Sequence, residues 1–375
     1  MASSHPMNPL VSVCIPTFNS AKYLKECIDS VLAQTFTDFE IVVVDNHSSD
    51  ETLSIIQEYA KRDLRFRVIC NERNIGAIPN FNRCIEIAQG DWIKFVHSDD
   101  LIAPRCLEEM LAVSKRNPEA AMICCRRDFL FEPGIDEETK QFYLKHLSHW
   151  SIESLFPNST SISASDFCKA VPDHYNFNIV GEYIAIMQHR NVFYRFGTFN
   201  THFAGISDIE FSTRVAIHTG LTYIPQTLAT TRVHGKSRTS NILDNNRYRH
   251  SHLDYLVLLH DFTFHPIYAP LREAARHHHP PLNFRNLLAQ GAYQARRIAE
   301  RSISNFADRN SPLLDDWKNI VDFYPALLIL SNWSLLEKIF FHARNKWGKV
   351  KQIVGKVIEV FTSKQVRDAA KKLTK

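Results

Sequence analysis

The chain has 375 residues, 45% of them hydrophobic and 22% charged, which is the composition of a globular protein long enough for two or three domains. No window of about 18 uncharged apolar residues and no apolar leader is visible, so we expect neither a membrane span nor a secretory signal. The net charge is only +4, and we expect no nucleic-acid partner. The eight cysteines lack a CxxC metal-binding spacing and lie mostly in apolar strand or helix patterns, which indicates buried thiols in a reducing compartment.

Short apolar strands alternate with amphipathic helices through the first third of the chain. In the first helical stretch, Leu24, Cys27, Ile28 and Val31 recur at helical spacing. The strands are apolar on both faces, which is typical of a parallel sheet covered by helices on each side. We therefore expect an α/β fold with a Rossmann-like, mostly parallel sheet. The expected strands are residues 11–15, 40–44, 66–70, 92–96 and 121–125.

The pattern is less regular beyond residue 126. We expect further strands at residues 188–193, 221–224 and 230–234, with a helix that begins at Ser207 before the second of them. After about residue 240 the pattern turns helical. We therefore divide the chain into a sheet domain, residues 1–240, and a helical C-terminal extension, residues 241–375.

Polar residues follow the expected strands at their carboxyl ends. In open α/β sheets, ligands bind just beyond these ends. We therefore expect segments that are far apart in sequence to meet at one edge of the sheet and to form a binding site. These segments include Pro16, Thr17, Asn19, Asp45, Asn46, Asn74, Ser98, Asp99 and Asp100.

The strand at residues 92–96 leads directly to the adjacent carboxylates of Asp99 and Asp100. Two acids at the end of a buried strand are costly unless a partner compensates their charge. A hard divalent cation such as Mg²⁺ or Mn²⁺ is a natural partner, because it prefers carboxylate oxygen. The alternative is a helix-capping aspartate with a solvated neighbour. The convergence of polar residues at the same edge favours a site.

Three other motifs do not support a function. The chain has no GxGxxG segment, which argues against a dinucleotide-binding oxidoreductase. Gly235-Lys236-Ser237 is similar to the end of a P-loop, but Thr230 stands where its first glycine should be. Histidines 277–279 lie in a basic, proline-rich loop, where solvated side chains are the simplest interpretation.

Several motifs together resemble the family 2 glycosyltransferases, over residues 11–240. The resemblance implies the GT-A fold and the transfer of a sugar from a nucleotide-sugar to an acceptor hydroxyl, with inversion at the anomeric carbon. The order and spacing of the motifs are more specific than any one of them. They are Pro16-Thr17-Phe18-Asn19, residues 43–50 with Asp45-Asn46, Asn74-Ile75-Gly76, Gly90-Asp91-Trp92-Ile93, Ser98-Asp99-Asp100, Ser207-Asp208 and Arg232-Val233-His234.

The resemblance also implies roles for individual residues. Asp99 and Asp100 would hold the Mn²⁺ or Mg²⁺ ion that stabilises the leaving diphosphate. Asp208 would be the general base that accepts the proton of the acceptor. The alternative for Asp208 is an acid that the helix dipole favours. The residues expected to bind the nucleotide-sugar, most simply a UDP-sugar, are Pro16, Thr17, Asn19, Asp45, Asn46, Asn74, His97, Ser98, Asp99, Arg232 and His234.

His97 stands where the family usually has the first acid of its metal motif. Its imidazole could contact ribose or metal, or it could simply end the strand. Arg232 and His234 match a late motif near the pyrophosphate, where a cation would neutralise charge on the leaving group. The alternative for Arg232 is an ordinary surface arginine.

The C-terminal 32 residues carry ten Lys and Arg and two acidic residues, a net charge of +8 that leaves −4 for the rest of the chain. Apolar residues recur at helical spacing between Val350 and Phe361, which predicts a basic amphipathic helix. This helix either contacts an anionic membrane surface or packs on the protein itself. We therefore expect a cytoplasmic enzyme, at the inner face of the membrane if the helix binds there, with a glycan or lipid-linked acceptor in polysaccharide synthesis.

Two other classes stay open. A nucleotidyltransferase on a related sheet would need a glycine-rich loop with Lys or Arg after the first strand, and none is visible. A catalytically silent relative that binds a partner or a glycan is compatible with Asn46, His97 and Ser207, which replace acids that are common in the family.

Overall fold

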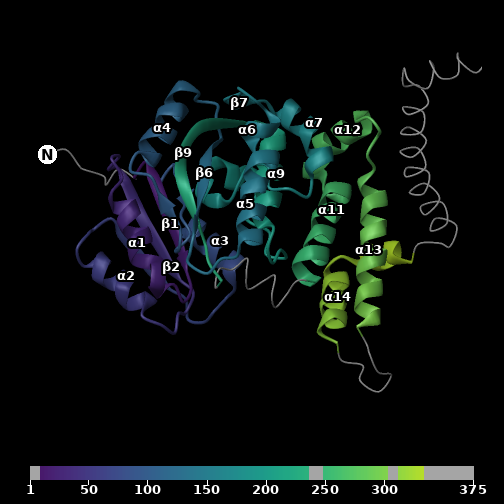
Figure 1. Ribbon diagram of the computed structural model, residues 1–375, viewed down its shortest axis with the longest axis horizontal. Helices are drawn as coiled ribbons and strands as arrows, with labels where there is room; N and C mark the ends of the chain where they lie inside the picture. Colours follow the sequence, from purple (N-terminus) through teal and green to yellow (C-terminus); the bar gives the residue numbers. More distant parts are fainter. Residues whose placement is uncertain (1–8, 236–247, 303–310, 333–375) are drawn as a thin grey trace, which may run out of the picture. The chain divides into compact units, whose positions relative to one another are not determined.

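The computed structural model describes residues 9–235, 248–302 and 311–332 (Figure 1). Within these ranges one nine-stranded sheet has the order β3-β2-β1-β4-β8-β6-β9-β5, and β7 pairs with β9. Its strands are β1 Val11–Thr17, β2 Phe39–Asp45, β3 Phe66–Cys70, β4 Trp92–Phe95, β5 Leu101–Ile102, β6 Met122–Phe131, β7 Ser161–Ile162, β8 Ile186–His189 and β9 Leu221–Val233.

The first four strands of this order, β3-β2-β1-β4, form a fully parallel sheet, as expected. β1 and β2 are buried on both faces, which agrees with their continuous apolar sequences. The helix between them buries Leu24, Cys27, Ile28 and Val31. The connecting helices are α1 Ala21–Leu32, α2 Thr52–Ala60, α3 Ala77–Ile87 and α4 Cys106–Arg116. This half places the ends of β1, β2 and β4 at one edge.

The other half of the sheet is mixed. β8 is antiparallel to both β4 and β6, while β6 is parallel to β9. The strand expected at residues 188–193 ends at His189 and is followed by helix α8, Asn191–Phe196. The strands expected at 221–224 and 230–234 are one strand, β9. Its register against β6 shifts near Pro225. Proline has no N–H to donate to a neighbouring strand, so it is tolerated where the regular pairing is interrupted.

Further helices belong to the same compact unit, which runs to Leu288. They include α9, the helix expected near Ser207; Ile206 is its N-cap residue and Ser207 is its first helical residue. Their bounds are α5 Glu137–Trp150, α6 Ile152–Leu155, α7 Ala164–His174, α9 Ser207–Thr219, α11 Asp254–Phe264 and α12 Ala269–His277, with short turns η1 Tyr183–Ala185, η2 Arg249–Leu253 and η3 Pro266–Tyr268.

The second compact unit begins at Ala289 and is helical in its described part. It holds most of α13 (Phe284–Arg301), with α14 (Pro312–Phe323) and α15 (Pro325–Ser331). The predicted domain boundary at residue 240 and the predicted basic helix at residues 350–361 lie outside the described residues and stay predictions. Among the described helices, none has the length and apolarity that crossing a bilayer requires.

Candidate active site

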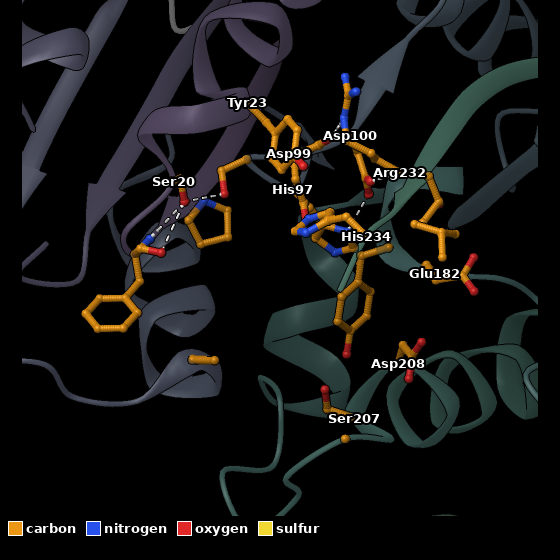
Figure 2. Close-up of a pocket in the computed structure, with 18 of the residues that line it drawn as sticks. Ser20, Tyr23, His97, Asp99, Asp100, Glu182, Ser207, Asp208, Arg232 and His234 are labelled. Carbon is orange, nitrogen blue, oxygen red and sulfur yellow. Dashed lines mark hydrogen bonds and ion pairs between the residues drawn. The ribbon is translucent and has the colours of Figure 1, made fainter. Parts of the chain in front are cut away.

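A cavity of about 1650 Å³ opens at the carboxyl ends of β1, β2 and β4 (Figure 2). It brings together residues from segments that are more than 200 positions apart in the sequence. The predicted site residues that line it are Pro16, Thr17, Asn19, Asn46, Asn74, His97, Ser98, Asp99, Asp100, Asp208, Arg232 and His234. Asp45 is fully buried behind this wall and is not part of the lining.

The Asp45 carboxylate is bound from within the protein at the end of β2. It accepts hydrogen bonds from the Thr17 hydroxyl (3.2 Å), from the Ser48 backbone N–H (3.0 Å) and from the Ser48 hydroxyl (2.5 Å). These bonds tie the end of β1 to the turn after β2. In this structure Asp45 supports the cavity wall at the end of β1 from behind.

Asn46 has a similar internal role. Its Nδ2 donates to Asn74 Oδ1 (2.8 Å) and to the Gly76 carbonyl (3.3 Å). Its Oδ1 accepts from the Ile75 N–H (2.9 Å) and from Asn71 Nδ2 (3.1 Å). An amide has two N–H donors and one oxygen with two lone pairs, so its hydrogen-bonding capacity is filled. Asn46 therefore fixes the loop after β3.

The sequence did not single out Phe18, an exposed aromatic residue at this end of the cavity. Its ring is 46% exposed and lines the cavity. The neighbouring backbone is held by bonds between loops, because Asn19 Oδ1 accepts from the Ser49 N–H (2.8 Å) and the Ser20 and Ser98 hydroxyls are 2.7 Å apart. An aromatic ring on a fixed turn can stack on a planar base.

Each acid of the Asp99-Asp100 pair has a histidine partner. His97 Nδ1 lies 2.8 Å from Asp100 Oδ2, and His234 Nε2 lies 3.0 Å from Asp99 Oδ2. Burial raises the pKa of Asp100 to about 6, although the bond from His97 opposes this shift. Burial also raises the pKa of Asp99, but His234 and the charge of His97 outweigh it, and the net pKa is lowered. The two acids are therefore electrostatically different.

Arg232 on β9 holds the turn that carries the two acids. Its backbone N–H donates to Asp100 Oδ1 (2.8 Å), and its Nε donates to the Asp99 carbonyl (3.0 Å). Its guanidinium forms ion pairs with Glu26 (2.7 Å) and Glu132 (2.8 Å). The side chain is buried, so the interpretation as an ordinary surface arginine is wrong. Two carboxylates already offset its charge.

A metal ion bound beside Asp99 and Asp100 would have few protein ligands. Both oxygens of Asp100 accept hydrogen bonds inside the protein, whereas the Asp99 side chain is partly exposed to the cavity. Across residues 9–235, 248–302 and 311–332, no group of three or more His, Cys, Asp and Glu is arranged to hold a metal. Such a donor set suits an ion that takes much of its coordination from substrate phosphate and water.

Asp208 lies in the first turn of α9, on the side of the cavity away from Ser20 (Figure 2). Asn178 Nδ2 donates to its Oδ2 (2.8 Å). The turn that precedes α9 is held by the buried carboxylate of Asp254, which accepts the N–H groups of Ala204 and Gly205. The predicted base and the predicted metal site therefore line one cavity and belong to different elements.

Comparisons with known proteins agree with this arrangement. Residues 12–174 match the family model described as Glycosyl transferase family 2. An uncharacterized protein of Mycobacterium tuberculosis is 29% identical over 249 residues, which cover 66% of this chain and 74% of that protein. An uncharacterized glycosyltransferase of Methanocaldococcus jannaschii is 31% identical over 201 residues, which cover 47% of this chain and 69% of that protein. The chain belongs to glycosyl transferase family 2.

The fold of this glycosyltransferase also matches a solved structure. TarS of S. aureus, determined in complex with UDP-GlcNAc, superposes with a TM-score of 0.52 and 18% sequence identity. The alignment covers 84% of this chain and 81% of the TarS chain. The expected GT-A-type α/β fold and the expected class of enzyme are therefore confirmed. The predicted roles of individual site residues are not tested by these comparisons and stay predictions.

Sequence analysis of the glycosyltransferase missed the residues that surround Asp208. Glu182 lines the cavity and pairs with the buried Arg127 of β6. Asn178 and Gly181 form the turn between this pair and Asp208. They lie in a stretch without a clear periodic pattern, and no motif marks them. The available signal was a charged residue, Arg127, next to the apolar start of a strand pattern, because a charge that becomes buried there needs a partner.

Proposed function

We propose that this glycosyltransferase moves a sugar from a nucleoside-diphosphate sugar to an acceptor hydroxyl with inversion, in the synthesis of a surface polysaccharide or a lipid-linked glycan. The observation that carries the proposal is the position of Asp208. It lines the same cavity as Asp99 but lies on the side away from Ser20, near which the nucleotide would bind (Figure 2). Inversion requires a base and a leaving group on opposite faces of the reacting carbon.

In the proposed reaction the acceptor oxygen attacks the anomeric carbon while Asp208 takes the proton of the hydroxyl. The bond between that carbon and the diphosphate oxygen breaks, and the nucleoside diphosphate leaves with the electron pair. Asn178 donates to Asp208 Oδ2, and this hydrogen bond would fix the orientation of the carboxylate during proton transfer. The protonated base would then return its proton to solvent.

A divalent ion, when bound, supplies charge stabilisation to the leaving diphosphate. Asp99 is the residue best placed to hold it, because its side chain reaches the cavity and its pKa is lowered. Asp100 would act mainly by holding the turn. The cavity wall from Pro16 to Asn19 and the loop at Asn74 would bind the nucleoside, with the ring of Phe18 against the base.

Asp208→Asn should test the base directly. We expect the rate of transfer to fall by about 10²- to 10⁴-fold, the usual contribution of a general base, while UDP affinity stays within about twofold. Asp166→Asn is a matched control, because Asp166 also lies in the first turn of a helix but outside the cavity. Wild-type turnover in Asp208→Asn would refute the base assignment.

The donor and the metal need a separate measurement. Calorimetric titrations of UDP with and without Mn²⁺ should show metal-dependent binding that Asp99→Asn weakens at least tenfold. UDP-GlcNAc, the ligand of TarS, is the first donor to assay, followed by GDP- and dTDP-sugars. Release of nucleoside diphosphate would separate an enzyme from a silent relative, since the latter should release none. Equal UDP binding with Mn²⁺ and with EDTA would contradict the metal role.

A further inference from the structure

The part of the cavity around Asp208 contains a second carboxylate whose role is unassigned. Glu182 lines the cavity, and its side chain is 26% exposed. Figure 2 shows Glu182 and Asp208 on the same side of the pocket, beyond His97 and His234 when viewed from Ser20. A partly buried carboxylate costs free energy unless another group in the protein or a ligand pairs with its charge.

The charge of Glu182 is compensated by Arg127. The guanidinium is 4% exposed, its Nε contacts Glu182 Oε2, and its Nη2 donates to Oε1 (3.3 Å). A carboxylate can accept about four hydrogen bonds, and this ion pair fills about half of that capacity. Glu182 therefore still has the capacity to accept hydrogen bonds from a ligand.

The segment that carries Glu182 is bonded directly to Asp208. Asn178 donates to Asp208 Oδ2 (2.8 Å), and its own Oδ1 accepts the Gly181 N–H (2.9 Å). Gly181 has a φ of +108°, and a Cβ there would lie 2.9 Å from Arg127 Nη1. The turn from Asn178 to Glu182 thus sets the position of both carboxylates, which is expected of groups that act on one ligand.

Aromatic rings also line the cavity, and one of them, Phe129, lies near Arg127, the partner of Glu182. Phe129 and Tyr143 line the cavity with ring centroids 4.9 Å apart, and Arg127 lies 5.9 Å from the Phe129 ring. Phe142, which also lines the cavity, is 63% exposed. A ring that exposed gains free energy when a ligand covers it.

This combination of groups selects for one ligand chemistry. A pyranose ring has a C–H face that packs on an aromatic ring and hydroxyls that donate to carboxylates. A hydrocarbon chain would cover Phe142 equally well, but it would desolvate Glu182 without replacing its hydrogen bonds to water, which costs free energy. A saccharide can pack on the Phe142 ring and also donate hydrogen bonds to the Glu182 carboxylate.

We propose that Glu182 and Phe142 form the acceptor subsite and that this subsite binds a saccharide ring. Phe142 packs on the ring, and Glu182 accepts hydrogen bonds from hydroxyls next to the one that Asp208 deprotonates. Glu182 is thus a specificity-determining residue. The inference rests on the proposed function, because it assumes that the acceptor enters beside Asp208.

Saturation-transfer NMR on the full chain with UDP and Mn²⁺ would test the subsite, with a panel of methyl glucopyranosides, galactopyranosides, mannopyranosides and N-acetylglucosaminides as probes. We expect at least one glycoside to bind the wild type and its affinity to fall at least fivefold in Glu182→Gln and in Phe142→Ala. UDP affinity should stay within twofold in both. Glu153→Gln is the matched control, because Glu153 pairs with the neighbouring Arg126 but does not line the cavity. It should behave as wild type.

The outcomes separate the two proposals. If UDP binds but no glycoside does, or if a short polyprenyl phosphate binds in its place, the saccharide subsite is refuted. Wild-type glycoside affinity in both variants would also refute it. If UDP does not bind, the proposed function is contradicted, but glycoside binding that depends on Glu182 and Phe142 would still support the saccharide subsite. Phe142 is exposed, so Phe142→Ala should fold even if Glu182→Gln is destabilised.

Discussion

Replacement of Asp254 should show how the base-bearing helix is held. Asp254 is fully buried, and its oxygens accept the Ala204 N–H (3.0 and 3.1 Å) and the Gly205 N–H (2.6 Å). Arg249 Nε lies 3.6 Å from Oδ1. Asp254→Ala removes the acceptor of two backbone donors and the partner of a largely buried cation. Loss of one partner of such a buried pair costs about 3–5 kcal/mol, so the free energy of unfolding should fall by about 4 kcal/mol.

Asp254→Asn should be milder and more informative. The amide keeps the size of the side chain and one accepting oxygen, so we expect a loss of about 1–2 kcal/mol. The turn is tight, because a Cβ at Gly205 would lie 2.1 Å from His250 Nδ1. Loosening it should displace Asp208, so that turnover falls about tenfold or more while UDP affinity is unchanged.

Urea denaturation followed by circular dichroism gives the stability, and calorimetry gives the UDP affinity. Glu273→Gln, a surface change on α12, is the control and should leave both within error. The explanation is wrong if Asp254→Ala costs less than about 1 kcal/mol. The proposed role of Asp254 in positioning Asp208 is also wrong if Asp254→Asn weakens UDP binding as much as it slows transfer. The substitution would then affect nucleotide binding as well as the base.

The other predictions concern the two ends of the cavity. Gly181→Ala should lower the free energy of unfolding by about 2–3 kcal/mol in urea melts, because alanine meets Arg127 and a strained φ. Asn46→Asp should weaken UDP binding at least tenfold by calorimetry, because a carboxylate would face the oxygens to which the amide now donates. In EDTA the wild-type free energy of unfolding should fall as the pH rises from 5 to 8, with a slope of up to about 1.4 kcal/mol per pH unit per proton. The folded pKa values of His97 and Asp100 are both raised, so the stability that each contributes is lost as the pH passes its folded pKa. His97→Gln removes one of these protons but also raises the pKa of Asp100 further, so the remaining pH dependence should move to higher pH, and an unchanged pH profile would contradict the coupling.

The parallel half of the fold was predictable because its signals are local. Each strand from β1 to β4 is short and mostly apolar, polar residues lie at or soon after its carboxyl end, and each connecting helix has an apolar face. The convergence of Asn19, Asn74 and Asp99 on one edge then follows from the geometry of parallel sheets.

The mixed half was not predictable in detail. β8 is only four residues long, and helix α8 begins two residues after its end. Val192 and Phe193 belong to this helix, although the sequence pattern placed them in the strand. The internal bonding of Asp45 and Asn46 was also invisible, because a sequence gives the chemistry of a side chain and not the direction in which it points. Arg232 was identified as a site residue, but its partners Glu26 and Glu132 lie far away in sequence.

The placement of Arg232 has a consequence for the order of folding. The turn with Asp99 and Asp100 is closed by a hydrogen bond from a residue 132 positions later, and β4 gains its second neighbour only when β8 has been synthesised. A nascent chain that has reached residue 174, where the family match ends, thus has an unpaired β4 edge and a buried acid without its donor. Contacts this distant in sequence close slowly. We expect the sheet to become protease-resistant only after β9 leaves the ribosome, as one cooperative step.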